Sequence, residues 1–260
     1  MARVFITGSA DGLGQLAARR LVALGHDVVL HGRNRDRAQA AMRAVPGART
    51  ALEGDLASIE ATRSLARQAN AAGPFQAVIH NAGIYGPSAG RRETIDGLDD
   101  VFAVNALAPY LLTALIEGTQ RLIYLTSGLH QSGDPDLRFL QRRTQRWSGA
   151  QAYANSKLFD VVLAFAVARL WPHVRSNAVD PGWVPTKMGG PSASDDLEQG
   201  AATQVWLAVS DDESAKVSGR YFYHRRTRAA HPAASAVSVQ DGFLVACEQL
   251  TRVRLAPVRA

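Results

Sequence analysis

The stretch RVFITGSADGLG, from Arg3 to Gly14, joins an apolar run to a glycine-rich turn. The run RVFIT has the β-branched and aromatic composition of a buried strand, and a helical stretch follows from about Leu13 to Leu24. Glycines at positions 8, 12 and 14 allow the backbone to turn sharply and to approach a pyrophosphate. The N-terminus of the next helix would supply unpaired N–H groups and a positive dipole. The stretch therefore predicts a strand–turn–helix unit that binds a dinucleotide, with a ligand-free glycine turn as the alternative.

The rest of the chain repeats this alternation of strand-like runs and amphipathic helical stretches. Further strands are predicted over residues 27–31, 49–55, 77–80, 121–127, 174–180 and 219–224, the last of which is expected to end the sheet. Helices are predicted after the second strand and over about 58–72 with Ser58 as the cap, 98–116, 149–170, 197–209 and 239–251. This order predicts an α/β fold, a three-layer doubly wound parallel sheet of the Rossmann type, in one domain over residues 1–260. Ligands of such sheets bind at the carboxyl ends of the strands.

Composition narrows the class of protein and its location. The net charge of +6 comes mostly from arginines spread along the chain, so a solvated surface with one phosphate-binding spot is favoured over a nucleic-acid-binding surface. The single cysteine, Cys247, excludes an internal disulfide framework and a cysteine zinc cluster, and it is interpreted as a small core residue; no metal site is predicted. The chain shows no secretory signal and no apolar run of the roughly 18 to 20 residues needed to span a membrane. We therefore expect a cytoplasmic protein.

Six motifs occur in an order that is specific when taken together. They are TGSADGLG (7–14), NAG (81–83), Asn105, Ser127, YANSK (153–157) and DPGWVPT (180–186). A lone Tyr-x-x-x-Lys pair is usually an ordinary surface pair, but the full set resembles the short-chain dehydrogenase/reductase family over residues 3 to about 190. The stretch VNALAPYLLT (104–113), the long interval before Tyr153 and the tail SGRYFYH (218–224) are similar to its retinol-dehydrogenase-like branch. That branch acts on bulky apolar carbonyls and alcohols.

Tyr153 and Lys157 lie four residues apart, on one face of a predicted helix. A phenol with a pKa of about 10 is mismatched to neutral pH, and an adjacent ammonium favours phenolate, so Lys157 is expected to lower the pKa of Tyr153. The resemblance implies that Tyr153 is the general acid or base and that Lys157 also holds the nicotinamide ribose. It further implies that Ser127 hydrogen-bonds the substrate oxygen and that Asn105 supports a water between Lys157 and solvent. A strand-end cap and a helix-interior hydrogen bond are the alternatives for Ser127 and Asn105.

The segment after the second strand bears on the choice of dinucleotide. A site for NAD usually has a carboxylate there for the ribose 2′-OH, whereas an arginine suits a 2′-phosphate. Gly32 and Arg33 therefore favour NADP(H) over NAD(H), although Asp11 in the glycine turn counts slightly against this preference. The predicted cofactor-binding residues are Thr7, Gly8, Ser9, Gly12, Leu13, Gly14, Arg33, Asp55, Leu56, Asn81, Ala82, Gly83, Tyr153, Lys157, Pro181, Gly182, Val184 and Thr186.

Two intervals depart from the family's usual lengths. The interval from Asn105 to Ser127 is shorter than usual, which puts in doubt the geometry of the homodimer expected by analogy with relatives. The interval from Ser127 to Tyr153 is longer and predicts a flap around residues 129–149, and a substrate loop is predicted around 183–200. Candidate substrate-lining residues, with ordinary packing as the alternative for each, are Tyr85, Leu129, Phe139, Trp147, Trp183 and Met188.

The sequence as a whole predicts an NADP(H)-dependent oxidoreductase that transfers hydride between nicotinamide and a carbonyl or alcohol of an apolar small molecule. The alternative from another class is a non-catalytic dinucleotide-binding sensor or interaction protein with the same fold, which would be expected to lose part of the motif set. A sugar-nucleotide epimerase is disfavoured because the chain is too short for an extra substrate lobe. His80 and His130 are interpreted as structural or rim residues.

Overall fold

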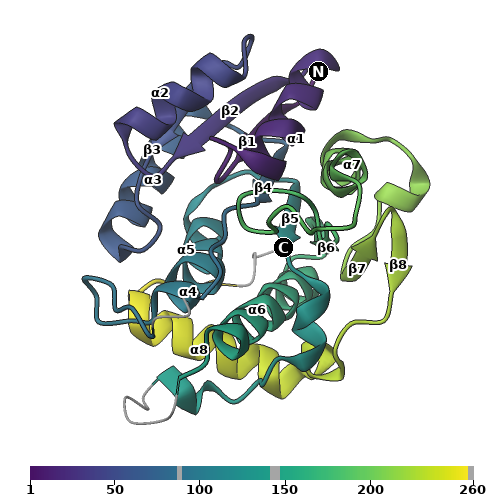
Figure 1. The fold of residues 1–260 in the computed structure, drawn as a ribbon. Helices are drawn as coiled ribbons and strands as arrows, with labels where there is room; N and C mark the ends of the chain where they lie inside the picture. Colours follow the sequence, from purple (N-terminus) through teal and green to yellow (C-terminus); the bar gives the residue numbers. More distant parts are fainter. Residues whose placement is uncertain (87–89, 141–146, 257–260) are drawn as a thin grey trace.

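The computed structural model describes residues 1–86, 90–140 and 147–256, without the side chains at 139 and 140. Within this part of the chain, eight strands form one sheet in the order β3-β2-β1-β4-β5-β6-β7-β8 (Figure 1). The strands are β1 (Arg3–Ile6), β2 (Asp27–Gly32), β3 (Thr50–Glu53), β4 (Ala77–His80), β5 (Arg121–Leu125), β6 (Arg175–Asp180), β7 (Arg220–Tyr223) and β8 (Arg226–Arg228). Strands β1 to β7 are parallel, and the strand order reverses between β1 and β4. The predicted doubly wound sheet is confirmed, and its ligand crevice belongs at this reversal.

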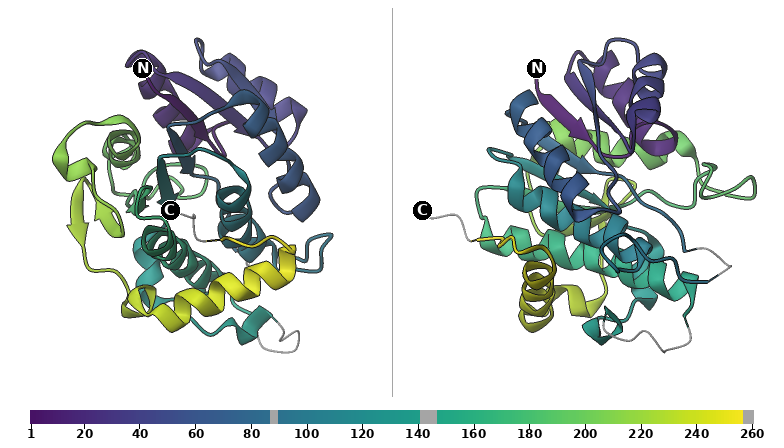
Figure 2. Two further views of the ribbon diagram at one scale, coloured as in Figure 1. Left: turned by 180° about the vertical axis from the view of Figure 1, so that it is seen from behind. Right: turned by 90° about the vertical axis from the view of Figure 1, so that its left-hand side faces the viewer.

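Helices cover both faces of the sheet and make the fold three-layered (Figures 1 and 2). They are α1 (Gly12–Ala23), α2 (Arg35–Ala44), α3 (Ile59–Ala72), α4 (Asp100–Phe102), α5 (Ala108–Leu115), α6 (Gly149–Leu170), α7 (Leu197–Val209) and α8 (Val237–Thr251). One buried cluster joins α1, α2 and α7 to the sheet through residues such as Leu21, Ala41 and Val205. A second cluster joins α3, α5, α6 and α8 through residues such as Leu65 and Leu158. Each face of the sheet therefore has its own core.

The edge of the sheet departs from the prediction. β7 was expected to be the last strand, but β8 pairs with it antiparallel. The two strands are joined through His224 and Arg225, whose φ angles are +47° and +61°. Glycine or asparagine usually occupies such left-handed positions in a hairpin, so the sequence carried no turn signal here.

The helix predicted over residues 98–116 is divided into three parts. After α4 the chain forms a π-helical turn over Ala103–Leu107 and then α5, which is only eight residues long. The wider π-helical turn contains Asn105. Such turns often mark functional sites, because they displace one side chain from the regular helical register.

Helix α8 lies against α6 and α5. It runs across the lower part of the molecule in Figure 1 and in the left view of Figure 2, and it is seen nearly end-on in the right view. The ring of Phe243 stacks on Phe159 with a centroid distance of 4.9 Å and meets Tyr110 edge to face at 6.4 Å. Beyond the helix, the Tyr110 hydroxyl donates to the carbonyl of Val253 at 2.8 Å. The chain thus covers this face of α6 with its own C-terminal segment.

No helix among the described residues is both long enough and apolar enough to cross a bilayer.

Candidate active site

The glycine turn after β1 is braced by the segment after β4. Thr7 Oγ1 accepts hydrogen bonds from the backbone N–H groups of Asn81 and Ala82, at 3.0 and 3.1 Å. The Asn81 amide donates in return to the carbonyls of Thr7 and Gly8. A Cβ on Gly8, which has a φ of +63°, would lie 2.8 Å from Ala82 Cα. Position 8 therefore requires glycine for close packing against Ala82, and the Asn81 side chain holds the turn through its two hydrogen bonds.

The N-terminus of α1 has the features of an anion site. Within the described residues, the N–H groups of Gly12, Leu13 and Gly14 have no protein acceptor. The N-cap residue Asp11 does not bond them, because its carboxylate pairs with Arg37 at 2.6 Å and Lys187 at 3.0 Å. A Cβ on Gly12 would meet only the Thr186 side chain, at 3.4 Å or more. Free donors beside an open glycine backbone fit a pyrophosphate.

The other predicted cofactor residues lie at neighbouring strand ends. Ser9 is buried and accepts from the backbone N–H of His31 at 2.8 Å, and His31 contacts the Gly54 carbonyl at 2.9 Å. These bonds tie together the carboxyl ends of β1, β2 and β3. Arg33 is exposed and lines a hollow of about 360 Å³ with residues that include Glu53 and Gly54. Asp55 and Leu56 follow β3; Gly83 follows β4; and Pro181, Gly182, Val184 and Thr186 follow β6.

Tyr153 lies on α6 with its ring largely buried. Its hydroxyl lies 3.9 Å from Met188 Sδ, and its ring contacts Tyr85 with a centroid distance of 4.8 Å. Burial raises the pKa of Tyr153 above its ordinary value, while Lys157 and a hydrogen bond with Ser127 act to lower it. Lys157 therefore acts on the pKa of this phenol in the predicted direction, but desolvation of the phenolate outweighs the ammonium, and the pKa is raised overall.

Lys157 is buried at the same end of α6, and its ammonium lies 5.8 Å from the centroid of the Tyr153 ring. It donates to the carbonyl of Leu125 at 2.7 Å and to Asp160 Oδ2 at 2.8 Å. Asp160 was not among the predicted site residues. The available signal was a single carboxylate, three residues after the lysine, in the otherwise apolar run LFDVVLAF.

Asn105 is fully buried and connects two other elements of the site. Its side-chain amide donates to Ser156 Oγ on α6 and to the Ile84 carbonyl, both at 2.9 Å, and its oxygen accepts from the Ile84 N–H at 2.8 Å. A Cβ on Gly83 would lie 3.4 Å from Lys157 Nζ and 3.5 Å from Asn105 Oδ1. By bonding Ile84, Asn105 therefore holds the segment after β4, including Gly83, beside Lys157.

The loop after β6 covers the glycine turn. Lys187 forms an ion pair with Asp11. The Trp183 backbone N–H donates to Asp195 Oδ2, and the Asp195 N–H donates to the Trp183 carbonyl. The Trp183 indole donates to the Gly189 carbonyl. This segment ends at α7, so residues 197–200 of the predicted substrate loop form the first turn of that helix.

The predicted substrate-lining residues do not all meet. Tyr85 and Met188 contact Tyr153, whereas the Trp147 indole donates to Asp99 Oδ2 at 2.8 Å, at the start of α4. The side chain of Phe139 and residues 141–146 of the predicted flap lie outside the described part of the chain. Four apolar side chains predicted to line the substrate site are roughly half exposed: Tyr85, Leu129, Trp183 and Met188.

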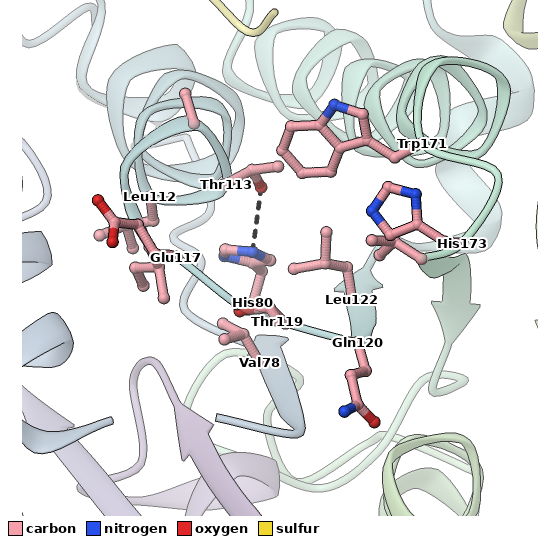
Figure 3. A pocket seen from close by; sticks show the side chains of 14 residues that line it. Val78, His80, Leu112, Thr113, Glu117, Thr119, Gln120, Leu122, Trp171 and His173 are labelled. Carbon is pink, nitrogen blue, oxygen red and sulfur yellow. Dashed lines mark hydrogen bonds between the residues drawn. The ribbon is translucent and has the colours of Figure 1, made fainter. Parts of the chain in front are cut away.

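A cavity of about 440 Å³ lies elsewhere, beside the amino ends of β5 and β6 (Figure 3). His80 lies at its inner end, where its Nε2 is 3.3 Å from Thr113 Oγ1 and its ring stacks on Tyr124. Burial lowers the pKa of His80 to about 3. His130 is also buried, with Nδ1 2.7 Å from the Ser127 carbonyl and Nε2 accepting from the His231 N–H. Both histidines have the structural roles that the sequence indicated.

The chain is similar to known proteins over most of its length. Residues 2–120 match the family model described as short chain dehydrogenase. The chain is 44% identical to an uncharacterised oxidoreductase of Emericella nidulans over 97% of its length and 98% of that protein. It is 29% identical to retinol dehydrogenase 14 of Mus musculus, over 84% of this chain and 76% of that protein. A crystal structure of an uncharacterised protein from Mycobacterium Paratuberculosis has a TM-score of 0.84 at 25% identity, covering 98% of this chain and 95% of that chain.

Proposed function

The chain belongs to the short-chain dehydrogenase family and is an oxidoreductase, and we propose that it uses NADP(H) to interconvert a carbonyl and an alcohol on an apolar small molecule. The observation that carries the proposal is that Tyr153, Lys157 and Ser127 lie together at the carboxyl ends of the strands. The open glycine turn lies at the same edge of the sheet. A non-catalytic dinucleotide-binding protein would have no need for this group of side chains.

The chemistry divides between the cofactor and the chain. When bound, a nicotinamide dinucleotide supplies or accepts the hydride. In the reducing direction Tyr153 gives its proton to the substrate oxygen, and Ser127 donates a hydrogen bond to the same oxygen as negative charge develops there. The ammonium of Lys157 stabilises the phenolate that remains. The burial of Tyr153 limits water near the reacting atoms.

The preference for NADP(H) is supported by the end of β2. A Cβ on Gly32 would lie 2.3 Å from the Ala38 backbone nitrogen, so a carboxylate side chain has no room at this position unless α2 moves. The exposed guanidinium of Arg33 follows directly and is suited to a 2′-phosphate. Asp11, the acid in the glycine turn, is already paired with Arg37 and Lys187.

An apolar substrate is supported by the surroundings of Tyr153. Tyr85 and Met188 contact it, and their exposed surfaces offer apolar area to a ligand. The relative named as a retinol dehydrogenase acts, by its name, on an apolar alcohol. Assembly as a homodimer and a cytoplasmic location stay predictions. A dimer would need a surface other than the part of α6 that α8 covers.

The decisive experiment is turnover with a panel of aliphatic and aromatic aldehydes and ketones, followed by the decay of NADPH or NADH fluorescence. We expect turnover with NADPH and the apolar members of the panel. Binding of both cofactors without any turnover would contradict the catalytic part of the proposal.

A further inference from the structure

Lys157 and Asp160 form an ion pair that is almost wholly removed from water. Their side chains are 5% and 2% exposed, and Nζ lies 2.8 Å from Oδ2. Both residues belong to α6, where positions three apart share a helical face. Among the described residues, Asp160 is the only acid within salt-bridge distance of this ammonium.

A buried ammonium needs such a partner. Desolvation favours the neutral amine, and buried lysines without a counter-ion can lose their proton near neutral pH. Burial alone would lower the pKa of Lys157, but the Asp160 carboxylate and Tyr153 together raise it above its ordinary value. Without Asp160, the charge that is to stabilise the Tyr153 phenolate would itself be unstable.

The same contact also orients the amine. An ammonium has three N–H donors, and two of them are directed to the carbonyl of Leu125 and to Asp160. The third has no acceptor among the described residues, and the centroid of the Tyr153 ring lies 5.8 Å from Nζ. A neutral residue at position 160 would release one of these two fixed bonds.

We propose that Asp160 is a positioning residue that keeps Lys157 charged and directed toward Tyr153, and that it thereby sets the pH range in which Tyr153 can donate a proton. The role in proton donation rests on the proposed function. The effect on the charge of Lys157 does not depend on turnover.

The other ionisable groups around the pair do not replace Asp160. Tyr124 faces it from β5, but burial raises the pKa of this phenol, and its hydroxyl is 2.7 Å from Thr113 Oγ1. His80, beyond Thr113, is neutral at ordinary pH because burial lowers its pKa. Asp180 on β6 acts on Tyr153 and bonds the Gly182 N–H. Burial raises the pKa of Asp160 itself, against the lowering effect of Lys157.

The first experiment measures the charge of Lys157 directly. The chain has only three lysines, at positions 157, 187 and 216, so lysine labelled with ¹³C at Cε gives three signals, which Lys187→Arg and Lys216→Arg assign. We expect the Lys157 signal to titrate above the ordinary pKa of a lysine in the wild type, and at clearly lower pH in Asp160→Asn. An unchanged titration in this variant would overturn the proposal. If the variant does not fold, titration of wild-type Lys157 below the ordinary pKa of a lysine would overturn the proposal.

The second experiment is the pH profile of kcat/KM for carbonyl reduction. In Asp160→Asn both Lys157 and Tyr153 should lose their protons at lower pH, because an anion that raises both pKa values is gone. The basic limb should therefore move to lower pH by at least ~1 unit, and Asp160→Glu should restore its position. A uniform fall in rate at every pH would indicate only a structural role and would contradict the proposal. If no variant or wild type turns over, the proposed function fails, while the lysine titration still tests Asp160.

Discussion

The pKa of the Tyr153 phenol is subject to two opposed influences, its burial and the nearby ammonium of Lys157. Burial raises its pKa, and Lys157 lowers it by less. A positive charge brought by an oxidised nicotinamide would act in the same sense as Lys157. A raised pKa favours the protonated phenol, which suits the proposed role of Tyr153 as the acid in carbonyl reduction.

Replacing Tyr153 with phenylalanine removes the proton donor and keeps the ring. Carbonyl reduction should fall at least ~100-fold in kcat, the usual contribution of a general acid, while the Kd for NADPH stays within about threefold. Steady-state kinetics and fluorescence titration measure the two quantities. Tyr85→Phe is the matched control, since it removes a neighbouring hydroxyl and keeps the ring contact. Equal losses in the two variants would argue against a special role for Tyr153.

Arg33 provides the corresponding test for the cofactor. Arg33→Ala should weaken NADPH binding roughly 10- to 100-fold, the value of about 1.5 to 3 kcal/mol for a charge-assisted bond, and should leave NADH binding nearly unchanged. Arg43→Ala, an exposed arginine in the last turn of α2, is the control. Isothermal titration with each cofactor gives the comparison. Equal weakening of NADPH and NADH would show that Arg33 does not read the 2′-phosphate.

At this scale the sequence predicted that the side chains of Tyr153 and Lys157 lie together, but it did not predict all of their partners. Tyr153 and Lys157 were found because their spacing places them on one helical face. Asp160 was missed, because an acid inside an apolar helix gives no sign of its partner until packing brings it beside Lys157. The sign of the Tyr153 shift also depended on burial, which a spacing of four residues does not reveal.

Among the elements, the sequence predicted α6 best, over the range Gly149–Leu170 that the structure has. Its boundaries follow from Ser148, whose side chain accepts from the Gln151 N–H, and from the proline that follows Trp171. Strand β8 could not be predicted, since the turn before it uses histidine and arginine at positive φ. The π-helical turn at Asn105 was missed for a related reason: periodicity alone does not distinguish it from a regular helix.

Helix α8 should contribute much of the stability of the α5–α6 layer. Phe243→Ala would leave a cavity between Phe159 and Tyr110 and should lower the free energy of unfolding by about 3 to 5 kcal/mol. Denaturant unfolding measures the change. Val245→Ala is the control on the exposed side of the same helix and should cost less than ~0.5 kcal/mol. A loss of under ~1 kcal/mol for Phe243→Ala would mean that α8 is not firmly packed.

For the whole molecule, the order of elements led to the correct layers, but not to the position of the C-terminal segment. The predicted last helix contains no motif that indicates which face of the sheet it covers. Its position depends on the packing of Phe243 against the rings of Phe159 and Tyr110. The cavity beside His80 was unpredictable for the same reason, because it depends on where the short α5 ends.

Two buried histidines should make the molecule sensitive to acid. Burial lowers the pKa of His31 to about 4 and of His80 to about 3, so below pH 6.5 the unfolded chain binds protons that the folded chain does not. Stability should fall as the pH drops, by about 2 kcal/mol per histidine at pH 5. Asp160 has the opposite effect on stability. Its pKa is raised in the folded state, so between about pH 7 and 4 its protonation stabilises the folded chain as the pH falls.

The contribution of His80 to the pH dependence of stability is therefore measured by comparing the wild type with a histidine variant. His80→Asn should show a flatter loss of stability than the wild type between pH 6.5 and 5, measured by urea unfolding at each pH. His173→Asn, at an exposed position, should follow the wild type. Parallel curves for His80→Asn and the wild type would mean that His80 is protonated in the folded protein.

The closure of the α6 surface by α8 has a consequence for how the polypeptide is made. Phe159 leaves the ribosome well before Phe243, so this apolar surface stays uncovered while residues 160–243 are translated. During that interval the nascent chain would be a ready target for chaperones that bind exposed hydrophobic segments.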